Sequence, residues 1–225
     1  MEAVIENIHK KYGRKEVLRG TSFRIVSGQC MGIVGANGSG KTTLLKILSG
    51  VLRPDEGRFL WQNADLLRSP SLRARTVAYV PQGTPLIEEL SARDNLRLWY
   101  TPQALEQSLD GGVLRRLGVH EFLRTPASRL SGGMRKRLSI GCALANDPSV
   151  LLLDEPSSAL DLVAKQQILR FFDDFRKNGG LLVLVSHDPW ELEMCDDWRM
   201  LRGGVLTPYS FNGERDALIR ELESK

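Results

Sequence analysis

The chain has 225 residues and a formal net charge of +4, and 42% of its residues are hydrophobic while 26% are charged. This composition is ordinary for a globular protein of one large or two small domains. No apolar run approaches the roughly 18 residues that a membrane-spanning helix needs, and no secretory signal is evident at the N-terminus.

The charged residues give no sign of a nucleic-acid-binding protein, and the cysteines give no sign of a metal-binding or disulfide-linked one. Basic and acidic residues are interspersed, so nucleic-acid binding is not expected, because a concentrated basic stripe is the usual sign of it. Cys30, Cys142 and Cys195 are widely spaced. They form neither a metal-binding pair nor an even disulfide set, which favours free thiols.

The first part of the chain alternates short apolar segments with helical ones. Strands are predicted at 29–34, 57–61 and 76–80, and a helix at 41–48. The first strand leads into a glycine-rich loop, and Gly50 lies beyond the end of the helix that follows this loop. This order of strand, loop and helix is typical of a mixed α/β fold.

The middle of the chain is helical. Ser91 and Asp94 form a capping box that opens a helix reaching about Tyr100, and Thr101-Pro102 opens another, with proline at the first helical position. Further helices are predicted at 113–117 and 133–145. The pattern therefore predicts a helical insert over about 84–147.

The α/β pattern then resumes. A buried strand is predicted at 149–153, and Asp161 is expected to cap a helix that ends near Lys177. Another buried strand is predicted at 181–185 and an amphipathic helix at 214–225. We therefore expect one domain, with its α/β core over about 1–83 and 148–225, around a largely parallel sheet.

The loop between the first predicted strand and helix is typical of a phosphate-binding loop. Gly35, Gly38 and Gly40 permit backbone angles and close approaches that place N–H groups around phosphate oxygens. The helix that follows presents its positive end to the same anion. We expect Lys41 to reach the β- and γ-phosphates of a nucleotide and Thr42 to hold Mg²⁺.

Two carboxylates follow the apolar strand at 149–153. Asp154 is expected to hold Mg²⁺, and Glu155 to accept a proton from the attacking water or to orient it. Adjacent strand residues point to opposite sides, so both can reach the site only if the backbone turns at the strand end. Acidic residues often follow a strand simply as solvated loop residues, and the phosphate loop is what favours the functional interpretation.

These motifs resemble those of the ATP-binding cassette (ABC) transporters, in the order of that family and over essentially the whole chain. The glycine loop resembles the family's Walker A motif and Leu151–Glu155 its Walker B motif. Leu130-Ser131-Gly132-Gly133-Met134 resembles the signature motif, with methionine where glutamine is common. The resemblance implies a P-loop NTPase (RecA-like) core, an N-terminal antiparallel β subdomain and an inserted α-helical subdomain.

The resemblance also implies roles for residues elsewhere in the chain. Gln82 resembles the Q-loop glutamine, which reaches Mg²⁺ or the attacking water, and His187 resembles the switch histidine, which stabilises charge on the γ-phosphate. Tyr12 is implied as an adenine-stacking aromatic, although it could equally be a strand residue of the core. Nucleotide contacts are further implied for Asn37, Ser39, Thr43, Ser131, Gly132, Gly133 and Asp161.

The implied function is that of an ATPase subunit that binds ATP and Mg²⁺ and powers a transporter. Two cassettes, identical or different, would close head to tail on ATP and drive a separate transmembrane permease subunit from the cytoplasmic face of the membrane. The string from Leu130 to Leu138 is similar to that of exporters of the drug, lipid or antibiotic-resistance type, so export is expected.

Three points stay open in the sequence. A soluble ABC ATPase for cofactor assembly or a nucleic-acid task is the alternative function. The basic run Arg135-Lys136-Arg137 is interpreted as a solvated helix face. Trp99 and Tyr100 fit either anchors for the membrane partner or core residues of the helical insert.

Overall fold

The computed structural model describes residues 1–158, 160–213, 218 and 220–221. Its first sheet is antiparallel, with the strand order β2-β1-β4-β5. These strands are β1 (Glu2–Tyr12), β2 (Lys15–Val26), β4 (Glu56–Trp61) and β5 (Ala64–Asp65). Along β1 and β2 buried residues tend to alternate with more exposed ones, as expected for a sheet with one face on the core and the other in water.

The second sheet carries the site and is largely parallel. Its strand order is β10-β9-β3-β8-β7-β6, and only β9 and β10 pair antiparallel. The strands are β3 (Cys30–Val34), β6 (Val77–Val80), β7 (Val150–Asp154), β8 (Leu181–Val185), β9 (Asp197–Arg202) and β10 (Val205–Tyr209). Every residue of β3, β7 and β8 is buried, because both faces of a central parallel strand are covered.

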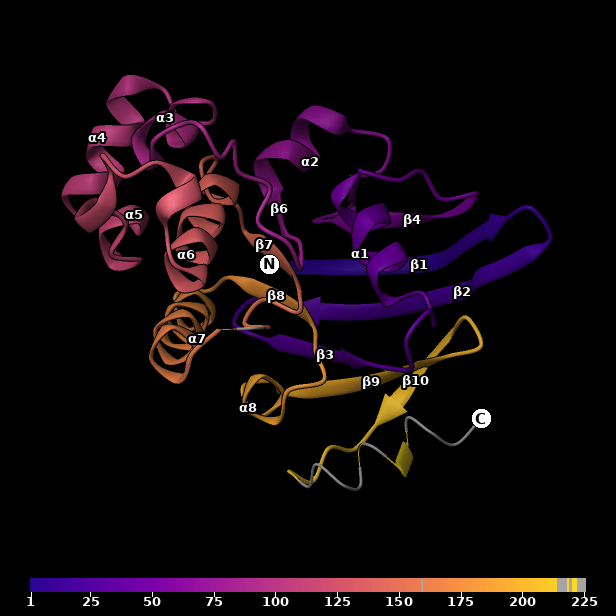
Figure 1. Ribbon diagram of the computed structural model, residues 1–225. Helices are drawn as coiled ribbons and strands as arrows, with labels where there is room; N and C mark the ends of the chain where they lie inside the picture. Colours follow the sequence, from indigo (N-terminus) through magenta and orange to yellow (C-terminus); the bar gives the residue numbers. More distant parts are fainter. Residues whose placement is uncertain (159, 214–217, 219, 222–225) are drawn as a thin grey trace.

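Helices pack on both sides of the parallel sheet. The α-helices are α1 (Lys41–Ser49), α2 (Pro70–Thr76), α3 (Ala92–Arg97), α4 (Pro102–Asp110), α5 (Val113–Arg116), α6 (Gly132–Ala143), α7 (Leu162–Lys177) and α8 (Pro189–Leu192), and the 3₁₀ turns are η1 (Val119–Phe122) and η2 (Ala127–Arg129). Helices α3 to α6 gather on one side of the parallel strands, and the antiparallel sheet lies on the other (Figure 1).

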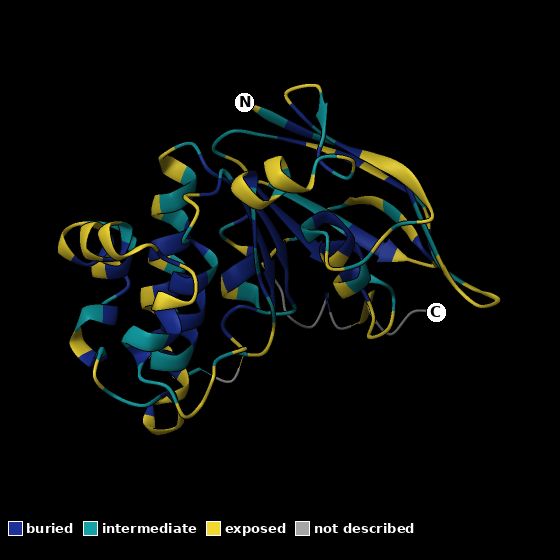
Figure 2. Cartoon of the chain, turned by 90° about the horizontal axis from the view of Figure 1, so that it is seen from above, coloured by how far each residue is buried: buried dark blue, intermediate teal, exposed yellow. Residues whose placement is uncertain are grey.

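Two apolar cores meet at the parallel sheet. Along β7, Leu151 and Leu153 pack into the core shared with the helical segment. Val150 and Leu152 pack into the core shared with α1 and the antiparallel sheet. Buried residues accordingly run through the middle of the molecule, and exposed ones gather on outer helix faces and loops (Figure 2). Strand β7 thus lies between the two apolar cores, and the acidic pair stands at its end.

The structure confirms the predicted buried strands and the helix after the glycine loop. The predicted helix to about Tyr100 is shorter, since α3 ends at Arg97. Residues 144 and 145 lie beyond the end of α6. Of the predicted terminal helix at 214–225, only 218, 220 and 221 belong to the described residues. The limits of 84 and 147 for the helical insert stay a prediction.

The described residues include no helix that is both long and apolar enough to cross a bilayer. Cys30, Cys142 and Cys195 are buried free thiols, as expected.

Candidate functional site

The loop between β3 and α1 has a backbone that requires glycine. Gly35 has a φ of 155°, and a Cβ there would lie 2.5 Å from the carbonyl oxygen of Leu201. Gly38 has a φ of 77° with open space around the position of a Cβ, so it is needed for its left-handed conformation. Glycine is therefore needed at 35 for the close approach of the loop to β9 and at 38 for its backbone conformation.

Most of the predicted site residues come together at one cavity of about 270 Å³. The cavity lies between the glycine loop, Gln82 and the ends of β7 and β8. Its lining consists of Val17, Asn37, Gly38, Gly40, Lys41, Thr42, Thr43, Gln82, Asp154, Glu155, Val185 and His187. Hydroxyl, amide and carboxylate oxygens thus share one cavity with an ammonium group, which is a donor set for a phosphate anion and a hard cation.

Lys41 is buried and bound to the loop. Its Nζ donates hydrogen bonds to the carbonyl oxygens of Gly35 at 2.6 Å and Ala36 at 3.1 Å. Burial lowers the pKa of Lys41, and the charges of Glu155 and Asp154 partly offset this effect. The ammonium is therefore held over the glycine loop, beside the two acids.

The backbone turns at the end of β7, so that both acids reach the cavity. Asp154 accepts a hydrogen bond from the hydroxyl of Tyr79 at 3.1 Å. Glu155 has a φ of 49°, an uncommon conformation for a residue with a side chain, and its N–H donates to the carbonyl oxygen of Val185 at 2.9 Å. The neighbouring strand β8 therefore holds the turn in place.

Glu155 and His187 face each other across the cavity, with Oε1 and Nε2 3.6 Å apart. Burial, and then the charge of Glu191, raises the pKa of Glu155 to about 7. Burial, and then the charge of Lys41, lowers the pKa of His187. A carboxylate with a pKa near neutrality is better suited to accept a proton than an ordinary one.

The signature residues lie outside this cavity. Ser131 caps α6, and its Oγ accepts a hydrogen bond from the N–H of Met134 at 3.3 Å. Ser131 and Gly132 are exposed, whereas Gly133 is buried against Ala164. The start of α6 thus presents a serine and backbone N–H groups to the surface of the single chain.

Asp161 and Tyr12 also lie outside the lining. Asp161 caps α7 as predicted and accepts a hydrogen bond from the N–H of Ala164 at 2.9 Å. Tyr12 ends β1 with 51% of its surface exposed, and the Lys10 ammonium lies 5.7 Å from the centre of its ring. Tyr12 is therefore not a core residue of the antiparallel sheet.

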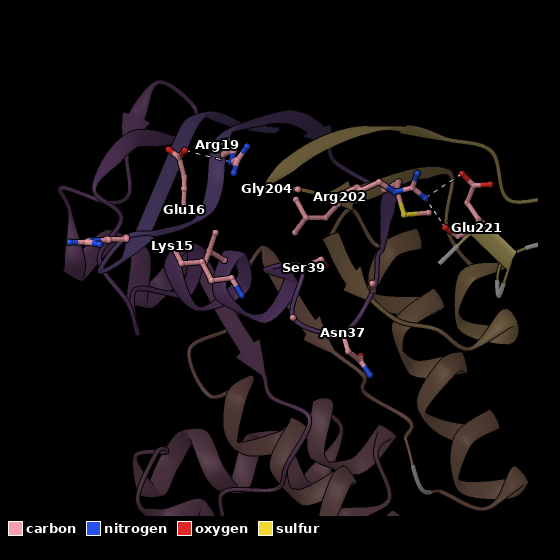
Figure 3. A pocket seen from close by; sticks show the side chains of 15 residues that line it. Lys15, Glu16, Arg19, Asn37, Ser39, Arg202, Gly204 and Glu221 are labelled. Atoms are coloured by element: carbon pink, nitrogen blue, oxygen red, sulfur yellow. Dashed lines mark hydrogen bonds and ion pairs between the residues drawn. The ribbon is translucent and has the colours of Figure 1, made fainter. Parts of the chain in front are cut away.

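A larger cavity of about 490 Å³ lies on the other side of the glycine loop. Figure 3 shows Lys15 and Arg19 of β2, Asn37 and Ser39 of the loop, and Arg202 around it. Val17, Asn37 and Gly38 line both cavities. The predicted residue Ser39 therefore lies at this second cavity rather than at the first.

The interpretation of the basic run on α6 is wrong for Lys136. This side chain is only 3% exposed, and its Nζ donates to the carbonyl oxygens of Pro81 at 2.7 Å and Gln82 at 3.2 Å. Burial lowers the pKa of Lys136 to about 8. Lys136 lies one helical turn from Gly133, which is also buried, so both lie on the inner face of α6.

Glu191 of α8 is a second residue that the sequence did not reveal. It is 1% exposed, and its Oε1 accepts a hydrogen bond from the N–H of Ser157 at 2.9 Å and another from the Ser157 hydroxyl. Burial raises the pKa of Glu191. Glu191 thus connects the segment after Glu155 to the segment after His187.

Comparisons with known proteins agree with this geometry. The family described as ABC transporter matches residues 18–158. The chain is 29% identical to the lantibiotic transport ATP-binding protein SrtF of Streptococcus pyogenes, covering 94% of this chain and 92% of that protein. It is 34% identical to the Nod factor export ATP-binding protein I of Ralstonia nicotianae, covering 89% and 64% respectively.

Two further matches concern the direction of transport and the assembly. The probable sulfate/thiosulfate import ATP-binding protein CysA of Chlorella vulgaris is 32% identical, over 92% of this chain and 89% of that protein. A solved dimeric ATP-binding cassette in a post-hydrolysis state, bound to ADP and Pi, superimposes with a TM-score of 0.79 at 26% identity, over 93% of this chain and 100% of that one.

The family match spans the glycine loop, the Q-loop glutamine and both acids at the end of β7. The chain belongs to the ABC transporter family and is an ATP-binding ATPase cassette with the P-loop NTPase fold.

Proposed function

We propose that this chain hydrolyses ATP to power export through a separate transmembrane subunit. The observation that carries the proposal is the single cavity in which a phosphate-loop lysine, a hydroxyl, a glutamine, two acids and a histidine converge. The carboxylate of Glu155, which faces His187 in that cavity, favours hydrolysis over nucleotide binding alone.

The glycine loop and Lys41 would bind the triphosphate. Backbone N–H groups of residues 35–40 and the start of α1 offer donors to phosphate oxygens. Asn37, Ser39 and Thr43 would add contacts to the nucleotide. Thr42, Gln82 and Asp154 offer hydroxyl, amide and carboxylate oxygens in one cavity. These groups fit Mg²⁺, which stabilises negative charge on phosphate oxygens when it is bound.

The chain's own groups would supply the proton transfer and the remaining charge stabilisation. Glu155 accepts a proton from the attacking water, a contribution typically worth about 10²–10⁴-fold in rate. His187 donates to an oxygen of the γ-phosphate, and Lys41 stabilises the same charge. The bond from Glu155 to Val185 keeps the carboxylate at the cavity.

The exposed signature residues support a head-to-tail dimer. Ser131 and Gly132 are exposed away from the cavity of their own chain, so they are free to contact the γ-phosphate bound to a second cassette, with Gly133 directly behind them. Asp161 would lie at the same contact, and Tyr12 would stack on adenine. The solved cassette with similar fold is a dimer. Whether the second cassette is identical is left to experiment.

A groove beside the Q-loop is our proposed docking site for the permease. It has a volume of about 270 Å³ and is lined by Pro81, Pro85, Trp99, Ser139 and Cys142 among others. Trp99 is 62% exposed, whereas the buried Tyr100 donates a hydrogen bond to the carbonyl oxygen of Gly141 at 2.8 Å. Trp99 is thus available as an anchor, and Tyr100 is a core residue.

The proposal also covers the limits of the helical subdomain, the location of the cassette and the direction of transport. The helical subdomain would comprise about 84–147, and the cassette would lie on the cytoplasmic face of the membrane. Export is favoured by the signature string and by relatives named as exporters, against the importer CysA. Recovery in a complex free of membrane protein would instead favour a soluble ABC ATPase.

The direct test is phosphate release from ATP by the purified chain. Lys41→Ala should abolish most turnover or nucleotide affinity, because it removes the ammonium held over the glycine loop. Lys46→Ala is the matched control, since Lys46 is exposed on the same helix. Equal activity in the Lys41 variant and the control would refute the proposed site.

A further inference from the structure

A further hollow, distinct from the cavities described above, lies between the helical segment and α7. Its volume is about 290 Å³, and it shares no lining residue with the nucleotide cavity. Four arginines from three helices line it: Arg115 and Arg116 of α5, Arg137 of α6 and Arg170 of α7. His120 and a single carboxylate, that of Glu121, complete the polar lining together with Gln167.

Among the described residues, these arginines differ from Arg135 and Arg176 in having no carboxylate within ion-pair distance. The adjacent Arg135 pairs with Glu88 at 2.6 Å, and Arg176 of α7 pairs with Asp173 at 2.9 Å. Across the part of the chain that the structure describes, none of the four arginines of the hollow forms an ion pair. The hollow therefore gathers four guanidinium groups against one carboxylate, that of Glu121, and an anion would relieve the remaining Coulombic repulsion.

The guanidinium of Arg137 is held in place. It donates a hydrogen bond to the carbonyl oxygen of Leu117 at 3.1 Å and lies 5.3 Å from the ring centre of Phe122. Gly118 has a φ of 67°, and a Cβ there would lie 2.6 Å from the Nη1 of Arg137. Glycine at 118 thus gives the guanidinium its space, and a fixed guanidinium loses little entropy on binding an anion.

We propose that this hollow binds a compact soluble anion that carries several phosphate groups. Guanidinium groups match phosphate oxygens with paired hydrogen bonds. Phe171 lies in the lining, but the guanidinium of Arg116 already lies 5.8 Å from its ring centre, so this face is not open to a nucleobase. An oligophosphate therefore fits the hollow better than a nucleotide does.

The test is a titration of the full chain with tripolyphosphate, in which amide NMR signals are followed residue by residue. This readout separates the hollow from the phosphate loop, because each has its own signals. We expect signals of 115–121 and 167–171 to shift in a saturable manner. Arg116→Gln with Arg170→Gln should weaken that affinity about tenfold or more, since both residues are exposed and contribute charge rather than core packing.

The matched control is Arg53→Gln with Arg75→Gln, which removes the same charge from exposed positions elsewhere. The control should leave the affinity of the hollow within about twofold, because its arginines lie outside the hollow and screened charges act weakly at a distance. The proposal is overturned if only the signals of 35–43 shift. It is equally overturned if the control weakens binding as much as the double variant does.

Discussion

At the residue scale, buried charged groups connect the loops around the nucleotide cavity. Lys136 reaches from α6 to two carbonyl oxygens of the Q-loop, and Glu191 reaches from α8 to Ser157. A buried charged side chain is retained only where partners compensate for its desolvation. Lys136 therefore acts as a positioning residue for Gln82, and Glu191 as one for the segment after Glu155.

Lys136→Met should slow ATP hydrolysis about tenfold or more while it leaves nucleotide binding close to normal. The variant keeps an unbranched side chain, one atom shorter, but loses both hydrogen bonds to the Q-loop, and hydrogen bonds of charged groups contribute about 1.5–3 kcal/mol. The measurement is kcat beside the equilibrium affinity for ATP. Arg135→Met is the control on the same helix, and an equal loss in both variants would contradict the positioning role.

Glu155→Gln should bind ATP normally and hydrolyse it at least about 100-fold more slowly, because an amide cannot accept the proton of the attacking water. Single-turnover phosphate release measures the chemical step. Asp188→Asn is a useful comparison, since that carboxylate lies outside the lining of the nucleotide cavity. Near-normal turnover of the Glu155 variant would remove this residue from the role of base.

At the scale of elements, α6 and α7 are in close contact where the signature begins. A Cβ at Gly133 would lie 2.6 Å from the Cβ of Ala164, whereas a Cβ at Gly132 would have Leu160 as its nearest neighbour at 3.9 Å. The absence of a side chain at 133 thus sets how closely α6 approaches α7. This contact fixes where Ser131 lies on the surface.

Gly133→Ala should therefore destabilise the fold, by about 1–3 kcal/mol, because overpacking forces the two helices apart. Gly132→Ala adds the same methyl group to the same helix with room for it, so its stability should be unchanged or slightly higher. Thermal or denaturant unfolding compares the two variants. If both lose stability equally, the close contact is not the cause.

The elements also show what the sequence can and cannot reveal. Strands β3 and β8 are apolar along their whole length and β7 is apolar up to Asp154, so their burial was evident, and the glycine loop marked the start of α1. The three basic residues of α6 gave no comparable signal, because the direction in which Lys136 points depends on how α6 packs on the Q-loop. The left-handed backbone of Glu155 likewise depends on its bond to Val185 in β8.

At the scale of the whole molecule, the residues of the two proposed half-sites do not meet within the single chain. The nucleotide cavity gathers Lys41, Asp154, Glu155 and His187, while Ser131 and Gly132 are exposed elsewhere. An anion site at the start of α6 gains from the positive end of the helix. ATP bound to one copy would therefore complete its contacts only through the start of α6 in a second copy.

Light scattering of the Glu155→Gln protein with saturating ATP and Mg²⁺ tests this dimer most directly. We predict the mass of two chains with ATP and of one chain without it. Adding Ser131→Arg should hold the protein at one chain, because the larger side chain fills the anion site, while Ser128→Arg, at another exposed serine before α6, should still dimerise. A single chain at saturating ATP, or dimers of the Ser131→Arg protein, would contradict the account.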